Sequence, residues 1–448
     1  MSGIFIKNPL AVFTGTDSDA GGGLIVRGDR IVELVPSGAE PKQPFGRVFE
    51  ADGHVLLPGL INTHHHFYQT LTRACPIALN KELFDWLSSL YPIWARLTPE
   101  HVALSTRLSL TELLLSGCTT ASDHHYLFPQ GLEQAIDIQV EEARRLGIRV
   151  VLTRGSMSLS QEDGGLPPKE VVQSEDRILA DSERLINEFH QSKDGAMVQI
   201  ALAPCSPFSV SPELMRESAL LARKHGVRLH THLAETHDET EFCLKTLGHR
   251  PVDYLEKKGW LEGDVWLAHG IHFNAEEIAR LGRAGVGICH CPSSNMILAS
   301  GICPVLDLEE AGVPVGLGVD GSASNDHSNM IQEARQALLL QRLRYGSQRV
   351  THLDAFRWAT TGSARCLGRS DIGSLALGKQ ADLALFRLDE PRFSGAGDPL
   401  AALLLCGAHR ADHVMVGGEW VVREGMIAGL DLDDLIRRHS RLAGSLAG

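Results

Sequence analysis

Residues 58–69 read PGLINTHHHFYQ, an apolar run followed by three consecutive histidines. Side chains alternate along a strand, so His64 and His66 share one face while His65 points away. A single His-x-His pair is weak evidence for a metal site, because a solvated loop can carry the same residues. What the pair does therefore depends on the residues that the rest of the chain brings beside it.

Between residues 58 and 371 the chain alternates short apolar runs with helical stretches. Residues 98–117 predict a helix that begins at a Thr-Pro-Glu cap and ends at Gly117, and residues 131–147 predict another that closes at Gly147. Eight runs predict buried strands: VLLPGLINT, TTASDHH, IRVVLTRG, MVQIALAPC, VRLHTHL, VWLAHG, VGICHCP and PVGLGVDG.

Eight strand–helix units predict an α/β fold, a TIM-like (β/α)8 barrel. A doubly wound open sheet is the alternative, but the chain has no Gly-rich nucleotide loop of the G-x-G-x-x-G or G-x-x-x-x-G-K-[ST] type. The sequence therefore favours the barrel.

Both ends of the chain predict short strands. GGLIVRGDRIVEL (22–34) and HVMVGGEWVVREG (413–425) each alternate around a two-residue turn, and ADLALFRL (381–388) is a strand pattern. We expect these strands to pair as one small β-sandwich domain. The predicted division is 1–57 for its first part, 58–371 for the barrel and 372–448 for its second part.

Composition limits the classes of function. The chain has 448 residues, 43% of them apolar, which suits one large unit with a small companion. A net charge of −13 argues against a nucleic-acid partner, although an uncharged free nucleobase stays open. We expect neither a signal peptide in MSGIFIKNPLAVF nor a membrane span, and nine scattered cysteines favour a reducing cytoplasm.

Polar residues recur where the predicted strands end. In a barrel of this kind the chemistry gathers at the carboxyl ends of the strands. A set spread over all eight strand ends is therefore more informative than any one member. Its members are His64, His66, Asp123–His125, Arg154, Cys205, His230, His232, His269, His290 and Asp320.

Four of these residues predict a metal site. His232 lies nearer the end of its strand than His230, so we assign His232 to the metal and His230 to a supporting position. With Asp320, the histidines His64, His66 and His232 form a nitrogen and oxygen set that suits zinc, or iron(II), with a position left open for water. Taken alone, Asp320 before Gly321 would be interpreted as a turn former.

Glu235 follows His232 by three residues, in the loop where a carboxylate can reach a metal-bound water. Such a carboxylate can take the proton of the water and return it to a leaving group. The alternative is that Glu235 caps the next helix. His269 can guide the water or stabilise the attacked atom, or it can be a hydrogen-bonded core histidine.

Further residues leave alternatives open. Arg154 can meet a carbonyl oxygen of a substrate or pair with a carboxylate at a strand end. Cys289 and Cys291 point away from His290, so we expect no structural zinc there. An aromatic stripe, formed by Phe84, Trp86, Tyr91 and Trp94, can be core or can cover a flat ring.

PGLINTHHH, HTHLAET, LAHG and GLGVDG together resemble the metal-dependent hydrolases of the amidohydrolase superfamily, in its aminohydrolase and deaminase branch. The resemblance covers essentially the whole chain. Five further segments are most similar to the members that act on 8-oxoguanine: NTHHHFYQTLTRA, CTTASDHHYLF, LTRGSMSL, APCSPFSVS and GICHCPSSNM. Members acting on guanine, isoxanthopterin or hydroxylated aminotriazines share the framework.

The resemblance implies hydrolytic deamination of a small heteroaromatic substrate by a water that one metal activates. It implies a metal held by His64, His66, His232 and Asp320, with Glu235 as proton shuttle, His269 as catalytic help and Asp320 also orienting the water. Two-metal members carry a carboxylated lysine at the end of the fourth strand, whereas VQIALAPCSPF has none.

By the same resemblance, Gln69 reaches the ring edge of the substrate, and Trp86 and Cys205 line the pocket. Members often assemble, which leaves a homo-oligomer open. A non-catalytic scaffold that keeps the fold is the remote alternative, and it would lack these ligands.

Overall fold

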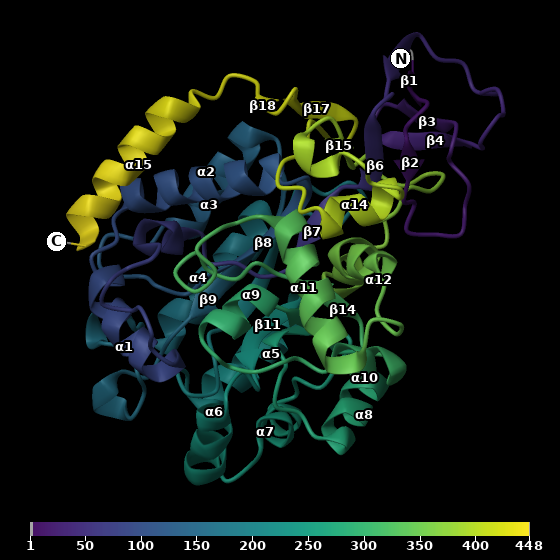
Figure 1. Cartoon of the computed structure of the whole chain (residues 1–448). Coiled ribbons are helices and arrows are strands. Elements are labelled where there is room, and N and C mark those ends of the chain that lie inside the picture. The colour runs from purple at the N-terminus through teal and green to yellow at the C-terminus, as the bar shows by residue number, and fades with distance from the viewer. Residues whose placement is uncertain (1–2, 448) are drawn as a thin grey trace.

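The computed structural model describes residues 3–447. Its centre is a barrel in which each strand pairs in parallel with the next one along the chain (Figure 1). The eight strands are β7 (Leu60–Asn62), β8 (Cys118–His125), β9 (Arg149–Ser156), β10 (Val198–Pro204), β11 (Leu229–Leu233), β12 (Val265–His269), β13 (Gly287–His290) and β14 (Val315–Leu317). The first and last strands meet where Thr63 N–H donates to Leu317 O at 2.9 Å. The predicted (β/α)8 barrel is confirmed.

The predicted strand VLLPGLINT is divided in the structure at Gly59. The preceding residues form β6 (His54–Pro58) of the sandwich, and the following ones form β7 of the barrel. A Cβ on Gly59 would lie 2.1 Å from Thr119 Oγ1, so only glycine lets the chain pass this close to β8. One apolar run therefore serves two sheets, a division that its hydrophobicity does not reveal.

Helices surround the barrel strands (Figure 1). The predicted helix 98–117 is α2 (Pro99–Leu115), capped by the Thr98 side chain. The predicted helix 131–147 is α3 (Ala135–Leu146); it begins four residues late, after Gly131 at φ +85°, and ends at Gly147 at φ +70°. The other barrel-region helices are α1 (Leu83–Trp94), α4 (Glu175–Phe189), α5 (Pro212–His225), α6 (His237–Phe242), α7 (Pro251–Lys257), α8 (Ala275–Ala284), α9 (Pro292–Ile297), α10 (Val305–Glu310), α11 (Met330–Tyr345), α12 (His352–Arg357) and α13 (Ser363–Cys366).

Short single-turn helices complete the description. Those of the 3-10 type are η1 (Phe67–Thr72), η2 (Gln161–Asp163), η3 (Lys169–Val171) and η6 (Pro391–Phe393), and those of the π type are η4 (Cys243–Leu247) and η5 (Trp358–Gly362). Among them η1 matters most for the site, because it directly follows His66.

Two further sheets pack as a sandwich beside the barrel, at the upper right of Figure 1. The first has the order β4-β3-β1-β5 and the second β18-β17-β16-β15-β6-β2. Their strands are β1 (Ile4–Lys7), β2 (Ala11–Val12), β3 (Gly23–Arg27), β4 (Arg30–Val35), β5 (Arg47–Glu50), β15 (Leu383–Arg387), β16 (His413–Val416), β17 (Glu419–Arg423) and β18 (Met426–Ile427).

Both predicted hairpins form, as β3–β4 and β16–β17. Antiparallel pairing of β6 with β15 joins the two ends of the chain. A shared apolar core includes Ile6, Leu24, Leu383 and Met415. The sandwich built from both ends is thus confirmed, while the boundaries at 57/58 and 371/372 stay a prediction.

The last helices of the described chain, α14 (Pro399–Leu405) and α15 (Leu432–Ala447), lie outside the sandwich sheets. Figure 1 shows α15, in yellow, running along α2. Leu435 packs in one cluster with Leu104 and Leu108 of α2, and His439 Nε2 lies 3.0 Å from Thr70 Oγ1 of η1. The helix therefore braces the segment that carries the His-x-His pair.

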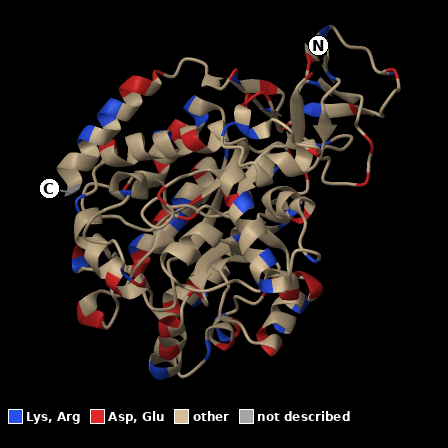
Figure 2. Cartoon of the chain, viewed as in Figure 1, with Lys and Arg blue, Asp and Glu red and all other residues tan. Residues whose placement is uncertain are grey.

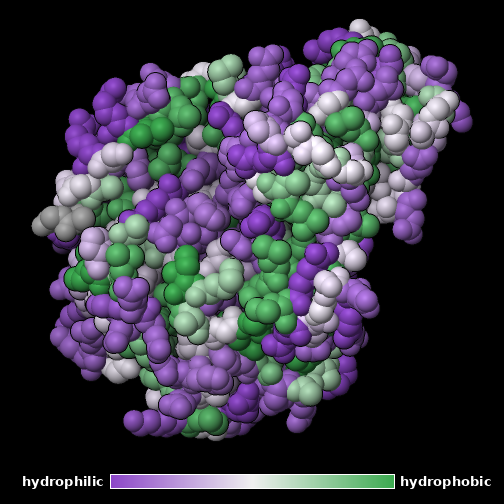
Figure 3. Space-filling view, in the orientation of Figure 1, coloured by the Kyte–Doolittle hydropathy of each residue, from purple (hydrophilic) through white to green (hydrophobic). Residues whose placement is uncertain are grey.

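Acidic and basic residues are interspersed along the chain, as the colours of Figure 2 show. Figure 3 shows apolar side chains over α9 and α11 on one face of the molecule, where Met296, Ile297, Leu339 and Leu343 are among the exposed ones. Among the helices of residues 3–447, none has an apolar stretch long enough to cross a membrane.

Candidate metal centre and active site

The three consecutive histidines follow β7 at the mouth of the barrel and divide as the alternation predicts. His65 turns away, with its Nε2 2.7 Å from Ser328 Oγ. His64 and His66 face each other at the centre, with ring centroids 4.7 Å apart. The two inward imidazoles are thus the first half of a cluster.

A chain of hydrogen bonds fixes the tautomer of His64. Its Nδ1 lies 2.8 Å from His230 Nε2, and His230 Nδ1 lies 2.8 Å from Trp266 O. Since a carbonyl oxygen only accepts, His230 donates from Nδ1 and accepts from His64 Nδ1–H. This leaves a lone pair on His64 Nε2, which is buried and has no partner. His230 thus supports a neighbouring imidazole, as the sequence predicts.

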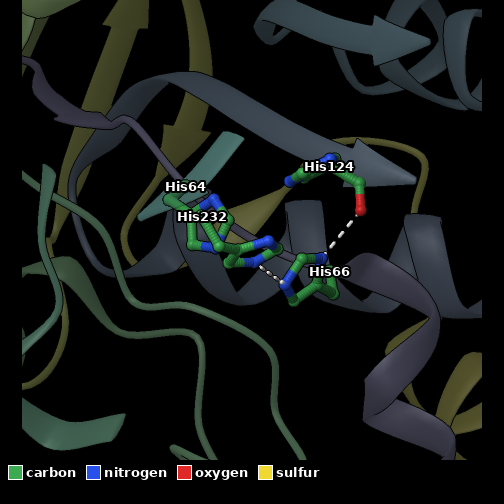
Figure 4. A group of neighbouring side chains, drawn as sticks. All are labelled: His64, His66, His124 and His232. Atoms are coloured by element: carbon green, nitrogen blue, oxygen red, sulfur yellow. Dashed lines mark hydrogen bonds between the residues drawn. The ribbon is translucent and has the colours of Figure 1, made fainter. Parts of the chain in front are cut away.

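His66 and His232 present the same nitrogen. His66 Nδ1–H donates to His124 O at 2.7 Å, and His232 Nδ1–H donates to Cys205 O at 2.6 Å. Their Nε2 atoms lie 3.2 Å apart, as Figure 4 shows. Burial lowers the pKa of His232 to about 3, so this ring is neutral at ordinary pH and keeps its lone pair.

Asp320 completes the cluster from the loop after β14. Its Oδ1 lies 3.3 Å from Nε2 of both His64 and His66. Ser294 Oγ donates to Oδ2 at 2.6 Å, which fixes the carboxylate. Asp320 also accepts from Gly321 N–H at 2.7 Å, so the turn and the cluster use the same residue.

These residues fit a divalent metal ion. Three buried Nε2 atoms and one carboxylate oxygen converge, and His64 Nε2 lacks any other partner. Their Nδ1 atoms are held by a carbonyl or another imidazole, the arrangement that orients histidines around metals. Nitrogen and oxygen donors of this kind suit zinc or iron(II).

His124, on β8, is a further imidazole that the sequence analysis placed at a strand end without a role. Its ligand atom lies within 4.8 Å of those of His64, His66 and His232. The ring stacks on that of His232 at 4.8 Å, and its buried Nδ1 has no partner. Side chains alternate strictly along TTASDHH, which turns His124 inward between Asp123 and His125. This alternation is the feature of the sequence that could have placed His124 in the cluster.

Glu235 reaches the cluster from a tight turn after β11. Both oxygens of Glu239 accept from this turn, from the N–H groups of Ala234 and Glu235 at 2.9 Å each. Thr236 is the residue that caps α6, so the alternative that Glu235 caps this helix is wrong. Burial, and then the charge of Asp320, raise the pKa of Glu235 to about 8. A carboxyl group with such a pKa can hold or release a proton near neutral pH.

His269, at the end of β12, stands beside Glu235. Its Nε2 lies 3.5 Å from Glu235 Oε2, and its Nδ1 pairs with Asn295 Oδ1 at 3.0 Å. It occupies the left-handed region at φ +72°, a conformation that costs energy for a residue with a side chain. The His269 ring is hydrogen-bonded through Nδ1, as a core histidine would be, but its Nε2 edge faces Glu235 and the metal-ligand cluster.

A pocket opens over this cluster, with about 420 Å³ of empty space including its mouth. Gln69, Trp86 and Cys205 line it, as the resemblance implies. Ala323 N–H donates to Gln69 Oε1 at 3.4 Å, which leaves the amide NH2 free. Burial raises the pKa of Cys205 to about 12, so its thiol stays protonated and acts as a small wall residue.

The aromatic stripe on α1 divides between the two predicted roles. Trp86 and Tyr91 line the pocket, whereas Trp94 is core and donates from Nε1 to Thr72 Oγ1 at 3.1 Å. Phe84 packs on Phe208 at 5.2 Å. Lining residues that the sequence analysis missed are Leu83, Leu87, Tyr126, Phe208, Leu298 and Ser324.

The structure does not bring Arg154 to the pocket. Its guanidinium donates to Asp181 Oδ2 of α4 at 2.8 Å and to Gln173 Oε1 at 2.7 Å, and it lies 3.9 Å from the ring centroid of Phe128. A buried guanidinium needs such partners, and they leave no donor directed at a substrate. Pairing with a carboxylate, the other interpretation of Arg154, is what the structure shows, with a helix supplying the carboxylate.

His290 also lies away from the cluster, 3.2 Å from Gln341 Nε2. Cys289 Sγ and Cys291 Sγ lie 3.6 Å from each other, and both residues are buried. Their side chains pack in one small core group with Trp266 and Cys366.

A barrel with this histidine and aspartate cluster at its mouth defines a class of hydrolases. Residues 55–421 match the Amidohydrolase family, and the chain belongs to that family. It is 67% identical to the 8-oxoguanine deaminase of Pseudomonas aeruginosa over 446 residues, covering 100% of this chain and 99% of that protein.

Other relatives are more distant but cover nearly the same length. Isoxanthopterin deaminase from an unknown prokaryotic organism is 35% identical, over 96% of this chain and 94% of that protein. The crystal structure of an atrazine chlorohydrolase from Arthrobacter aurescens, complexed with zinc, is 33% identical with a TM-score of 0.92, covering 98% of this chain and 100% of that one. The chain is therefore an enzyme of the deaminase branch.

Proposed function

We propose that this enzyme converts 8-oxoguanine and water to uric acid and ammonia. The observation that carries the proposal is the position of Glu235, a buried carboxyl group with a raised pKa, between the metal-ligand cluster and the lined pocket. Similarity to the 8-oxoguanine deaminase of Pseudomonas aeruginosa supports this substrate over other heteroaromatic amines.

His64, His66, His232 and Asp320 would hold one divalent ion, for which we propose zinc, with iron(II) as the alternative. When bound, such an ion lowers the pKa of a coordinated water from about 15.7 to about 7. Asp320 has one oxygen directed at the histidines and the other held by Ser294, so it can also orient that water.

Glu235 is the group that moves the proton. Its Oε1 is buried without a partner, so it is free to take a proton from the attacking water. It then delivers the proton to a ring nitrogen next to the attacked carbon C2. His269, 3.5 Å from Glu235 Oε2, stabilises the charge that develops. The proton of the new hydroxyl group then passes to the exocyclic amine, C2 becomes a carbonyl carbon, and the amine leaves as ammonia.

The pocket walls hold the flat ring. We propose that the free amide NH2 of Gln69 donates to the edge of the ring, while Trp86 packs against it and Cys205 limits its depth. Trp86 is itself fixed, because its Nε1 donates to Ala323 O at 3.2 Å. Gln69 and Trp86 both contact Ala323, in the loop that follows Asp320. The position of the substrate therefore depends on the same loop that carries a metal ligand.

Ammonia release from a panel of 8-oxoguanine, guanine, isoxanthopterin and hydroxylated aminotriazines tests the proposal. We expect the highest kcat/KM with 8-oxoguanine. A clear preference for a pterin or triazine would show that the proposed substrate is wrong while the proposed type of reaction is right. No ammonia from any of them, with the metal bound, would support the non-catalytic scaffold instead.

We also propose the cytoplasm as the compartment and a role in purine metabolism. All nine cysteines are free in the structure, and eight of them are buried, as suits a reducing environment.

A further inference from the structure

A second group of metal-ligand side chains lies in the β-sandwich, outside the site described above. His54 begins β6, and His413 begins β16 directly after Asp412. Ligand atoms of these three residues lie within 4.8 Å of one another. Because β15 lies between β6 and β16 in the sheet, the group joins an early strand of the chain to a late one.

Both imidazoles converge on one carboxylate oxygen. Asp412 Oδ2 lies 2.7 Å from His54 Nε2 and 3.2 Å from His413 Nε2, and the two ring centroids are 5.7 Å apart. Three donor atoms thus lie almost as close together as ligands around one ion. The register of the sheet fixes this approach, since Leu385 of β15 pairs with His413 and Arg387 with His54.

The hydrogen bonding of the group is incomplete. The Nδ1 atoms of His54 and His413 are buried and have no partner, so each ring has one polar contact, through Nε2 to the same oxygen.

Aromatic side chains shield the group from one side. The ring of Phe49 meets that of His413 edge-on at 4.8 Å, and Trp420 lies 5.6 Å from it. The side chains of His54, His413 and Asp412 are 6%, 12% and 18% exposed, so an ion can reach the group from solvent at the edge formed by Asp412 and His413. Polar donors inside an apolar shell, open at one edge, are typical of metal sites in proteins.

We propose that His54, Asp412 and His413 form a second, structural site for a divalent transition metal. Two imidazole nitrogens and one carboxylate oxygen are ligands for zinc and its neighbours, whereas magnesium and calcium take oxygen ligands. Water at the exposed edge supplies the remaining ligand. The ion joins the start of β6 to the start of β16 within one sheet, where residues 54 and 412 are 358 positions apart.

Zinc content per chain tests this site. After saturation with zinc and removal of the excess by gel filtration, elemental analysis of the wild type should give about two equivalents. His413→Gln and Asp412→Asn should each hold about one and keep the ammonia-release rate of the wild type. The control His225→Gln removes a histidine paired with a single carboxylate, Glu183, and should still hold two.

A variant without the active-site ion separates the two sites. His64→Asn combined with His66→Asn should bind about one zinc, and zinc should raise its melting temperature; adding His413→Gln should abolish both effects. One equivalent in the wild type, or none in the double variant, overturns the proposal even if a sandwich variant does not fold. A full two equivalents in His413→Gln would overturn it as well.

Discussion

Replacing Glu235 with glutamine tests the proton shuttle directly. Glutamine keeps the shape of the side chain and its contact with His269, but it cannot take a proton from water. General acid–base groups contribute about 10²–10⁴-fold to kcat. We expect the upper half of that range, because the neighbouring His269 has a pKa lowered by burial and is a weaker base.

A loss on the order of 10³–10⁴ in kcat corresponds to about 4–5 kcal/mol of activation free energy. The assay is steady-state ammonia release, together with metal content and circular dichroism of the same preparation. The matched control is Glu241→Gln, which removes an exposed carboxylate from the neighbouring α6 and should leave kcat unchanged. Turnover near that of the wild type in Glu235→Gln, or a loss that follows metal content alone, would refute the reasoning.

Three other expectations follow from the geometry. His232→Ala should lower metal content and kcat together, since it removes one of three Nε2 donors; a fully loaded, active variant would show that another residue is the ligand. His230→Phe removes the acceptor of His64 Nδ1–H and should weaken metal affinity by about 10–100-fold in a chelator competition, with partial rescue by glutamine; unchanged affinity would argue against a supporting role. Burial lowers the pKa of His290 to about 3, below its ordinary value of 6.5 in the unfolded chain, so its stabilising contribution is complete above pH 6.5 and is lost as the pH falls. Between pH 6.5 and 5.5 the free energy of unfolding in urea should therefore fall by about 1 kcal/mol more in the wild type than in His290→Gln, and equal losses would contradict this.

Much of the barrel could be predicted because its signals are local. Buried parallel strands appear as apolar runs, and helix ends carry caps such as Thr98 and Gly147, which need only their neighbours. The division of VLLPGLINT at Gly59 could not be predicted, because it is caused by contact with Thr119, a residue distant in the sequence. The late start of α3 likewise depends on a turn at Gly131 whose polar residues resemble a first helical turn.

The ligand cluster could be predicted for a related reason. A barrel brings all its strand ends to one rim. Alternation selects His64 and His66 as inward residues, and the position nearer the strand end selects His232 over His230. Arg154 shows the limit of this logic, since its position on a strand gives no sign that Asp181 and Gln173 enclose it. Tyr126 and Leu298 were missed because nothing in their local sequence distinguishes a pocket wall from core.

The brace formed by α15 has a consequence for the order in which the enzyme is made. His439 meets Thr70 across 369 positions of sequence, so the ribosome releases the helix long after the histidine loop has emerged. In a nascent chain whose barrel has already closed, η1, which contains Gln69, still lacks the contact with α15. Catalytic competence is thus expected to arrive as one of the final events of synthesis, which limits hydrolysis by half-made chains.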